Sequence, residues 1–204
     1  MERGRPRGFD EQQALDAALA VFWRNGYQAA SMADLTQAMG ISKPSLYAAF
    51  GKKEQLFLAA LQRYRDQQVI KHAQALAAEP DLRRAMRAFL RSVAGMLTAA
   101  ELPGGCMVVN SAVACDTASL PPRVAAAITS TVNQSSVDLL KTRLEQELQQ
   151  RHLPQNTRVE QMAEYFATLM SGMAVMAKVG ATRESLFNTI DQALCILPGS
   201  GGAD

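Results

Sequence analysis

The chain has 204 residues, 48% of them hydrophobic and 20% charged, with a net charge of +2, so it can bury one sizeable core or a small helical domain beside a larger one. No apolar run approaches the roughly 20 residues of a bilayer span, and the basic, polar start MERGRPRGFDEQQ lacks the apolar stretch of a secretory signal. These features argue against a membrane partner and against export, and we expect a soluble, cytoplasmic protein.

Apolar residues recur at helical spacing along almost the whole chain, and no segment alternates as a strand does, which predicts an all-α fold. Gly26, Gly40 and Gly51 interrupt this pattern and mark the ends of three helices. The next helix is longer than a three-helix unit needs, and we expect it to link two domains. The predicted helices span about 10–25, 31–39, 42–49, 52–78, 81–100, a short segment from the 103–105 loop to 116, 121–150, 157–179 and 185–197.

Capping motifs support two of these helix starts. In this motif a Ser or Thr and an acidic residue three positions later satisfy free backbone N–H groups at the start of a helix. Ser31 with Asp34 fits the pattern, and Thr157 with Glu160 repeats it. The expected domain organisation is a three-helix domain with a basic arm over 1–51, a helical effector-binding and dimerisation domain over 52–198, and a disordered tail over 199–204.

Residues 31–50, SMADLTQAMGISKPSLYAAF, fit two short helices joined by a tight turn, which is the helix-turn-helix pattern of DNA-binding proteins. Gly40 supplies the positive φ that such a turn often needs, and Ile41 can anchor it in the core. Small and cationic residues lead the second helix, so its backbone can approach base edges while a lysine or tyrosine reaches a phosphate. An ordinary helical hairpin with solvated lysines is the alternative. The predicted DNA-contacting residues of this segment and the next helix start are Ser31, Ser42, Lys43, Pro44, Ser45, Tyr47 and Lys52.

The excess positive charge lies in the N-terminal third of the chain. Residues 1–65 carry nine Lys and Arg against six Asp and Glu, whereas residues 66–204 carry twelve against thirteen. Arg3, Arg5 and Arg7 would form an arm that suits insertion into a minor groove, and a solvated tail is the alternative. Together with the helix-turn-helix, the arm predicts double-stranded DNA as a partner.

The segment from about Asp10 to Leu61 resembles the N-terminal domain of TetR-type transcriptional regulators. The resemblance rests on WRNGYQAASM and on ADLTQAMGISKPSLYAAFGKKEQLF. It implies a three-helix DNA-binding domain, a helical ligand-binding domain, a homodimer built by the last two helices, and repression as the usual outcome. Pro44 departs from the family, in which many members carry Gly or Ala, and the stiffer turn could alter operator preference without abolishing binding.

The most informative segment of the second domain is LPGGCMVVNSAVACD at 102–116. It places Cys106 at a predicted helix N-terminus, where the helix dipole and free N–H groups favour a reactive thiolate; a buried, inert cysteine is the alternative. Three cysteines cannot all pair, so free thiols are expected. The pattern GC-V-N-C-D resembles a branch of TetR-type regulators that includes sensors of electrophiles. That resemblance implies that Cys106 acts together with Lys178, which could otherwise be a solvated lysine at a helix end.

A noncovalent apolar ligand is the competing effector. Apolar and methionine side chains could line a helical cavity, and Asn110 could supply its polar contact, although each could equally belong to the core. No metal ion or other cofactor is expected, and the effector would repack the second domain and shift the helix over 52–78. The predicted lining residues are Phe89, Val93, Met96, Val109, Val113, Phe166, Met170 and Met173.

The last two predicted helices carry apolar stripes that would pair across a two-fold axis as a four-helix bundle. A homodimer would hold two recognition helices about 34–36 Å apart and read a palindromic operator. The sequence supports no enzyme, because His72 and His152 lie far apart and no phosphate-binding loop follows a strand. The alternative is a helical protein-interaction module whose helix-turn-helix no longer binds DNA, and salt-sensitive DNA binding would separate the two.

Overall fold

The computed structural model describes residues 9–113, 119–131 and 136–197. Throughout these ranges the regular secondary structure is helical, which confirms the expected all-α fold. None of the described helices is both long enough and apolar enough to cross a membrane. The basic arm, Cys115 and the C-terminal tail lie outside the described residues.

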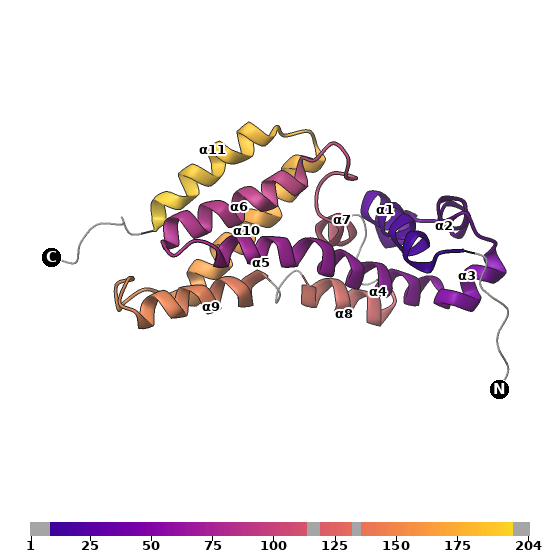
Figure 1. Cartoon of the computed structure of the whole chain (residues 1–204), viewed down its shortest axis with the longest axis horizontal. Coiled ribbons are helices and arrows are strands. Elements are labelled where there is room, and N and C mark those ends of the chain that lie inside the picture. Colours follow the sequence, from indigo (N-terminus) through magenta and orange to yellow (C-terminus); the bar gives the residue numbers. More distant parts are fainter. Residues whose placement is uncertain (1–8, 114–118, 132–135, 198–204) are drawn as a thin grey trace.

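Three helices, α1 (Glu11–Ala29), α2 (Met32–Met39) and α3 (Lys43–Phe50), form a unit at one end of the molecule (Figure 1). Gly26 takes φ +72° and breaks the helical geometry of α1 where the sequence predicted its end, and a further turn then continues the element. Leu35 of α2 is fully buried. The buried side chains of this unit belong to one apolar core that continues into the helices that follow.

Local chemistry sets both ends of α2, as predicted. Ser31 Oγ accepts a hydrogen bond from the Asp34 backbone N–H at 3.0 Å, and the Asp34 carboxylate accepts one from the Ser31 N–H at 3.1 Å. This reciprocal pair confirms the capping box at Ser31. Gly40 ends the helix with φ +64°, a value that costs a glycine little. The turn between α2 and α3 is thus specified by residues within it.

One continuous helical run leads from this unit to the far end of the molecule (Figure 1). It consists of α4 (Lys53–Tyr64), a π-helical turn (Arg65–Val69) and α5 (Ile70–Ala77), and it corresponds to the long helix expected over 52–78. The π-helical turn was not predicted. Such single wide turns occur frequently at functional sites, and this one is flanked by residues that line a cavity. We refer to α4, the π-helical turn and α5 as the linking run.

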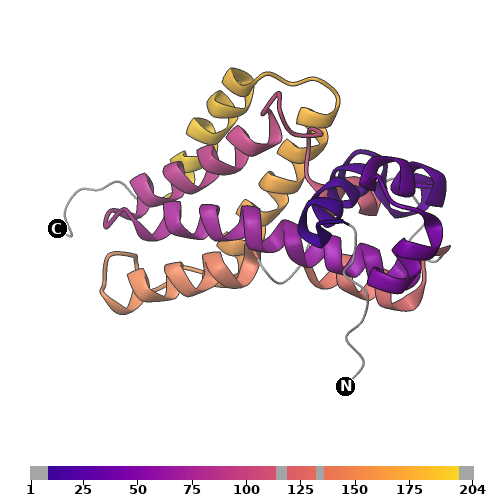
Figure 2. The same ribbon diagram turned by 45° about the vertical axis from the view of Figure 1, so that its right-hand side comes forward.

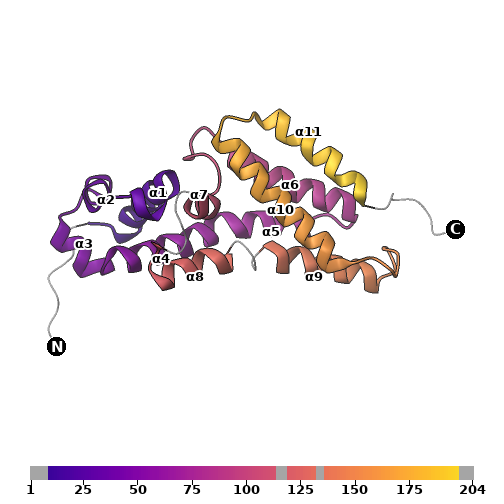
Figure 3. The ribbon, with the colours of Figure 1, turned by 180° about the vertical axis from the view of Figure 1, so that it is seen from behind.

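The second domain packs its helices on both sides of the linking run (Figures 1, 2 and 3). Helix α6 packs on α5, α11 packs on α6, and α8 packs on α4, while α10 contacts α6, α7 and α9. The helix expected over 121–150 is described as two helices, since residues 132–135 lie outside the described part. The helices are α6 (Leu82–Leu97), α7 (Met107–Val113), α8 (Pro122–Ser130), α9 (Ser136–Gln149), α10 (Val159–Lys178) and α11 (Arg183–Ala193), which ends in a 3-10 turn, Leu194–Ile196.

The capping box predicted at the start of α10 is wrong. The helix begins after Arg158, which makes no side-chain cap. The Glu160 carboxylate instead pairs with the ammonium of Lys141 in α9 at 2.9 Å. The motif at Thr157 matches the one at Ser31 in residue types, but here a cation on a neighbouring helix takes the carboxylate. Glu160 therefore joins α10 to α9 through Lys141, in addition to a backbone hydrogen bond at the start of its own helix.

Candidate DNA-contacting surface and effector cavity

The first turns of α3 carry several of the predicted DNA-contacting side chains. Lys43 and Tyr47 are exposed, whereas Leu46 between them is fully buried and anchors the helix. Ser42 caps α3, because its Oγ accepts from the Ser45 N–H at 3.3 Å and lies 2.9 Å from Ser45 Oγ. Ser45 is half-buried. The start of α3 thus holds small and cationic side chains outward on a fixed backbone.

The other predicted DNA contacts divide into exposed residues and residues outside the described part. Ser31, Pro44 and Lys52 are exposed. The Ser31 hydroxyl is already engaged with the capping carboxylate at 2.7 Å, so its side chain serves the start of α2 as well. Arg5 and Arg7 lie outside the described residues.

Two adjacent lysines at the start of α4 have different surroundings. Lys52 is exposed. The ammonium of Lys53 donates to the carbonyl of Gln28 at 3.2 Å and lies 4.6 Å from the centre of the Tyr27 ring, and burial lowers its pKa. Lys53 therefore fastens α4 to the end of α1, and Lys52 is the lysine that remains exposed for an outside partner.

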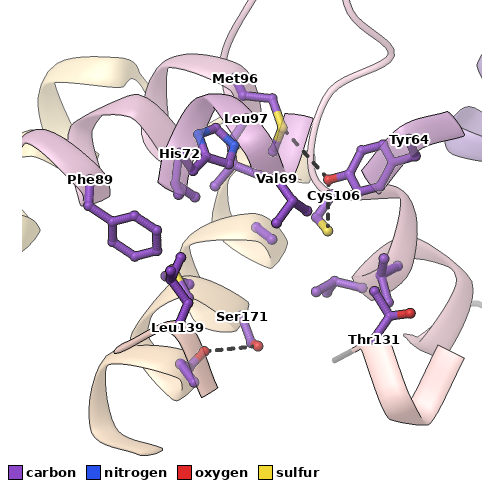
Figure 4. A pocket seen from close by; sticks show the side chains of 16 residues that line it. Tyr64, Val69, His72, Phe89, Met96, Leu97, Cys106, Thr131, Leu139 and Ser171 are labelled. Carbon is purple, nitrogen blue, oxygen red and sulfur yellow. Dashed lines mark hydrogen bonds between the residues drawn. The ribbon is translucent and has the colours of Figure 1, made fainter. Parts of the chain in front are cut away.

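A cavity of about 100 Å³ lies among the linking run, α6, α7, α9 and α10 (Figure 4). Its wall is mostly apolar, and the described side chains that line it include no Asp, Glu, Lys or Arg. The lining residues are Tyr64, Val69, His72, Phe89, Val93, Met96, Leu97, Cys106, Val108, Val109, Thr131, Leu139, Ala167, Met170, Ser171 and Ala174.

The cavity brings together some of the residues predicted for effector binding and leaves others elsewhere. Val113 is 67% exposed, and Phe166 and Met173 are buried in the core outside the cavity lining. Helical periodicity predicts which face of a helix is apolar, but it does not show whether that face meets a cavity or another helix. The predicted residues that line the cavity are Phe89, Val93, Met96, Cys106, Val109 and Met170.

Asn110 and Lys178 do not line the cavity but fasten the second domain to α1. Asn110 Nδ2 donates to the Trp23 carbonyl at 3.0 Å, and Lys178 Nζ donates to the Arg24 carbonyl at 3.2 Å. Trp23 Nε1 donates in turn to the Gly105 carbonyl at 3.0 Å. The two acceptor carbonyls, those of Trp23 and Arg24, lie just before the break in α1. Carbonyl groups at such a position lack hydrogen-bond partners within the helix. We call Trp23, Gly105 and Asn110 the α1 junction.

Cys106 directly follows the α1 junction residue Gly105 and immediately precedes α7. The Tyr64 hydroxyl is 3.2 Å from Cys106 Sγ and 3.7 Å from Met96 Sδ (Figure 4). Burial raises the pKa of Tyr64 well above its ordinary value, so the phenol stays protonated and can donate to sulfur. The structure thus gives the thiol the Tyr64 hydroxyl as a polar neighbour, while the Lys178 ammonium bonds to the Arg24 carbonyl, and joint action of Cys106 and Lys178 stays a prediction. No sequence signal joins Tyr64 to a cysteine 42 positions away.

His72 is another polar cavity residue that the sequence did not indicate. Its Nδ1 lies 2.8 Å from Ser92 Oγ, whereas its Nε2 is buried and has no hydrogen-bond partner among the described residues. Burial, with a smaller effect of Lys71, lowers the pKa of His72 to about 4. The imidazole is therefore neutral near pH 7. A lone histidine on a helical pattern could equally have been exposed, so only the packing reveals its place.

Two family descriptions together match most of the chain. Residues 14–60 match bacterial regulatory proteins of the tetR family, and residues 82–192 match the tetracyclin repressor-like C-terminal domain. Two similar proteins of Escherichia coli strain K12 are the HTH-type transcriptional repressors ComR and BdcR. ComR is 34% identical over 197 residues, covering 96% of this chain and 92% of ComR. BdcR is 30% identical over 190 residues, covering 93% of this chain and 90% of BdcR.

The solved structures include a similar protein bound to DNA. It is a cysteine mutant of the TetR family transcriptional regulator CifR, complexed with 26-base-pair double-strand operator DNA. It superposes with a TM-score of 0.90 at 37% sequence identity and covers 96% of this chain and 100% of its own. The similarity therefore extends over both the helix-turn-helix unit and the domain that holds the cavity.

Proposed function

The chain belongs to the tetR family of bacterial regulatory proteins, and on this premise we propose that it is a transcriptional repressor that binds operator DNA as a homodimer. Operator affinity falls when the central cavity is occupied or when Cys106 is modified. The observation that carries this proposal is the α1 junction, which joins the cavity wall to the unit that presents α3. The similar proteins are transcriptional regulators, so the proposal includes no catalytic activity.

The start of α3 supports recognition of the major groove. Lys43 and Tyr47 are exposed on a helix that a buried leucine anchors. An ammonium and a phenol in these positions can contact phosphates or a base edge, and Lys52 adds a second ammonium at the start of α4. Arg5 and Arg7 belong to the same proposal, in which they enter the adjacent minor groove.

The C-terminal helices support a homodimer. Large apolar side chains remain exposed along α10 and directly after it, where Tyr165 is 42% exposed, Met176 53% and Val179 74%. A second copy would cover these side chains across a two-fold axis and hold two α3 helices one turn of DNA apart. Such a dimer reads a palindromic operator, because each half-site then meets the same protein surface.

The α1 junction provides the route from the cavity to the DNA-binding unit. Trp23 bonds to Gly105, the neighbour of Cys106, and its ring packs edge-on against Tyr64 with the ring centres 4.8 Å apart. A ligand or adduct that displaces Tyr64 or the start of α7 would therefore move α1 and the linking run together. A coupling free energy of about 1–3 kcal/mol, or roughly 5–150-fold in operator affinity, is the expected size.

Cys106 gives the cavity a nucleophile. With N-ethylmaleimide as the probe, sulfur would bond to one carbon of the reagent's double bond and the thiol proton would pass to the other carbon, so the addition needs no oxidant. The cavity measures only about 100 Å³, so an adduct of this size must displace Tyr64 or its neighbours. That displacement is the event that lowers operator affinity.

Operator release tests the proposal. A bound sequence is selected from random duplexes, and its binding is followed by fluorescence anisotropy with and without N-ethylmaleimide. We expect the selected DNA sequence to be palindromic. We expect N-ethylmaleimide to release this DNA from the wild-type protein but not from the Cys106→Ser variant. Cys195→Ser, at an exposed cysteine outside the cavity, is the matched control and should respond as the wild type does. Selection of no palindrome would contradict the DNA-binding part, and release from Cys106→Ser would exclude this thiol as the trigger.

A second variant tests the route. Trp23→Phe keeps an aromatic ring against Tyr64 but removes the N–H that bonds to Gly105. A net hydrogen bond contributes about 1 kcal/mol, so we expect the reagent's effect on operator affinity to shrink by roughly fivefold. An undiminished response would show that the signal reaches α3 by another path, such as the linking run alone.

A further inference from the structure

The central cavity favours an uncharged occupant. Over residues 9–113, 119–131 and 136–197, its lining contains no Asp, Glu, Lys or Arg, and moving an ion from water into such surroundings without a partner is strongly unfavourable. Its volume of about 100 Å³ is smaller than the roughly 150 Å³ of an apolar cavity that accepts benzene. A neutral molecule of a few non-hydrogen atoms therefore fits, and Met96 and Met170 can adapt to a somewhat larger one.

His72 supplies a polar atom that no described part of the chain satisfies. The residue is only 8% exposed, and its ring stands on the cavity wall (Figure 4). Nδ1 bonds with Ser92 Oγ, which fixes the ring, and the buried Nε2 has no partner among the described residues. A buried polar atom of this kind destabilises the folded protein if it stays unpaired. A ligand atom that reaches Nε2 would relieve that destabilisation.

The other polar side chains of the lining are already engaged. The Tyr64 hydroxyl lies within hydrogen-bond reach of Cys106 Sγ. Thr131 and Ser171 donate to backbone carbonyls of their own helices, at 2.7 Å and 3.1 Å. Among the described lining residues, His72 Nε2 is thus the buried side-chain nitrogen or oxygen left for a ligand.

We propose that His72 Nε2 is the polar anchor of this cavity, and that its ligand is a small, uncharged, largely apolar molecule with one hydrogen-bonding oxygen, a carbonyl or a hydroxyl. A neutral imidazole serves either group, because its tautomer can donate to a carbonyl or accept from a hydroxyl while the Ser92 hydroxyl adjusts. Carboxylates, phosphates and amines are excluded as ligands. The ligand's role as an effector rests on the proposed function, whereas its binding requires no DNA.

Nitrogen NMR of the full-length protein tests the anchor directly. The chain has two histidines, and the side chain of His152 is 62% exposed, so ¹⁵N-histidine labelling gives one reporter at His72 and one internal control. The probes are 2-butanone, its alkene isostere 2-methyl-1-butene, and butyrate as the charged analogue. We expect 2-butanone to shift the Nε2 signal of His72 and to leave both signals of His152 unchanged. We expect the alkene to bind about tenfold more weakly, since it lacks the hydrogen bond, and butyrate to shift nothing.

A matched pair of variants isolates the contribution of Nε2. His72→Phe keeps a ring of similar size and removes both nitrogens, so its affinity for 2-butanone should fall about tenfold, to the level of the alkene. His152→Gln, at an exposed site outside the cavity, should bind 2-butanone as the wild type does. His72→Phe also removes the hydrogen-bond partner of Ser92, which could disturb the fold of the variant. The comparison of 2-butanone with the alkene in the wild-type protein does not depend on how the variant folds.

Equal affinities of the wild type for 2-butanone and the alkene, or binding of butyrate at the level of the ketone, would overturn the proposal. Operator binding, followed by fluorescence anisotropy in the presence of 2-butanone, then distinguishes a failure of this proposal from a failure of the proposed function. A shift at His72 without operator release supports the anchor and removes its regulatory role. Operator release without a shift at His72 overturns the anchor and leaves the repressor.

Discussion

The turn before α3 and the loop before α7 use the same backbone device, a glycine at positive φ, but their surroundings differ. Gly40 takes φ +64°, and a side chain added there would meet nothing within 4 Å. Gly105 takes φ +65°, but an added Cβ would lie 2.9 Å from Asn110 Oδ1 and 3.2 Å from the Ala174 carbonyl oxygen. The first glycine shapes a turn at the surface. The second lets three segments that are distant in the chain meet beside the cavity.

This contrast extends to the two functional regions. The helix-turn-helix unit directs its predicted DNA contacts outward, so changes there should alter affinity for DNA and leave the fold stable. The cavity and the α1 junction direct their polar groups inward, so changes there should alter stability together with regulation. The two regions are therefore distinguished by measuring unfolding and operator binding on the same variants.

The largest effect is expected from Gly105→Ala. An alanine at positive φ costs about 1–2 kcal/mol, and its overlap with Asn110, whose amide is held by the Trp23 carbonyl, adds about 1–3 kcal/mol. Gly40→Ala, the matched control, should cost only the backbone contribution. Urea unfolding of both variants measures the difference. Equal losses of unfolding free energy would show that the α1 junction is loose and would remove the contrast between the two glycines.

A smaller effect on the unfolding free energy is expected when the pH is lowered and His72 becomes protonated. Burial lowers its pKa from 6.5 to about 4, so the unfolded chain binds more protons than the folded protein between these values. The contribution of His72 to stability is therefore complete above pH 6.5 and is lost as the pH falls toward 4, by about 2–3 kcal/mol. Unfolding free energies at pH 7 and pH 4.5 should differ less in His72→Phe than in the wild type. A His72→Phe curve parallel to that of the wild type would contradict the burial of a neutral imidazole.

The smallest effect is expected from removing single lysines. Lys43→Ala should weaken operator binding by about 1 kcal/mol, roughly fivefold, and reduce its salt dependence, because one phosphate contact is lost. Its unfolding free energy should not change, since Lys43 is exposed. Lys53→Ala should instead lower the unfolding free energy, because this lysine bonds to Gln28 and lies over Tyr27. Fluorescence anisotropy measures operator affinity and urea unfolding measures stability for both variants. Loss of stability in Lys43→Ala, with loss of operator affinity alone in Lys53→Ala, would contradict the roles given to the two lysines.

Much of the N-terminal unit was predictable because its determinants are local. The capping box at Ser31, the turn at Gly40 and the outward placement of Lys43 all depend on residues within a few positions of one another. The motif at Thr157 shows the limit of such reasoning, since a hydroxyl residue followed three positions later by an acidic one gave no cap there, and Glu160 pairs with Lys141 of another helix. A local motif is reliable only where no distant partner competes for its side chains.

The sequence by itself determined the helical class, the helix-turn-helix and the apolar faces from which a cavity could form, because helical periodicity and capping act over a few residues. Only the tertiary structure decided which face meets a cavity and which partner each polar group finds. Tyr64 reaches Cys106 across 42 positions, and Lys178 reaches Arg24 across 154. Hydrophobic burial has no preferred direction, so a pattern of apolar residues shows that a face is buried without showing what covers it. Packing was likewise needed to show that Nε2 of His72 has no hydrogen-bond partner among the described residues.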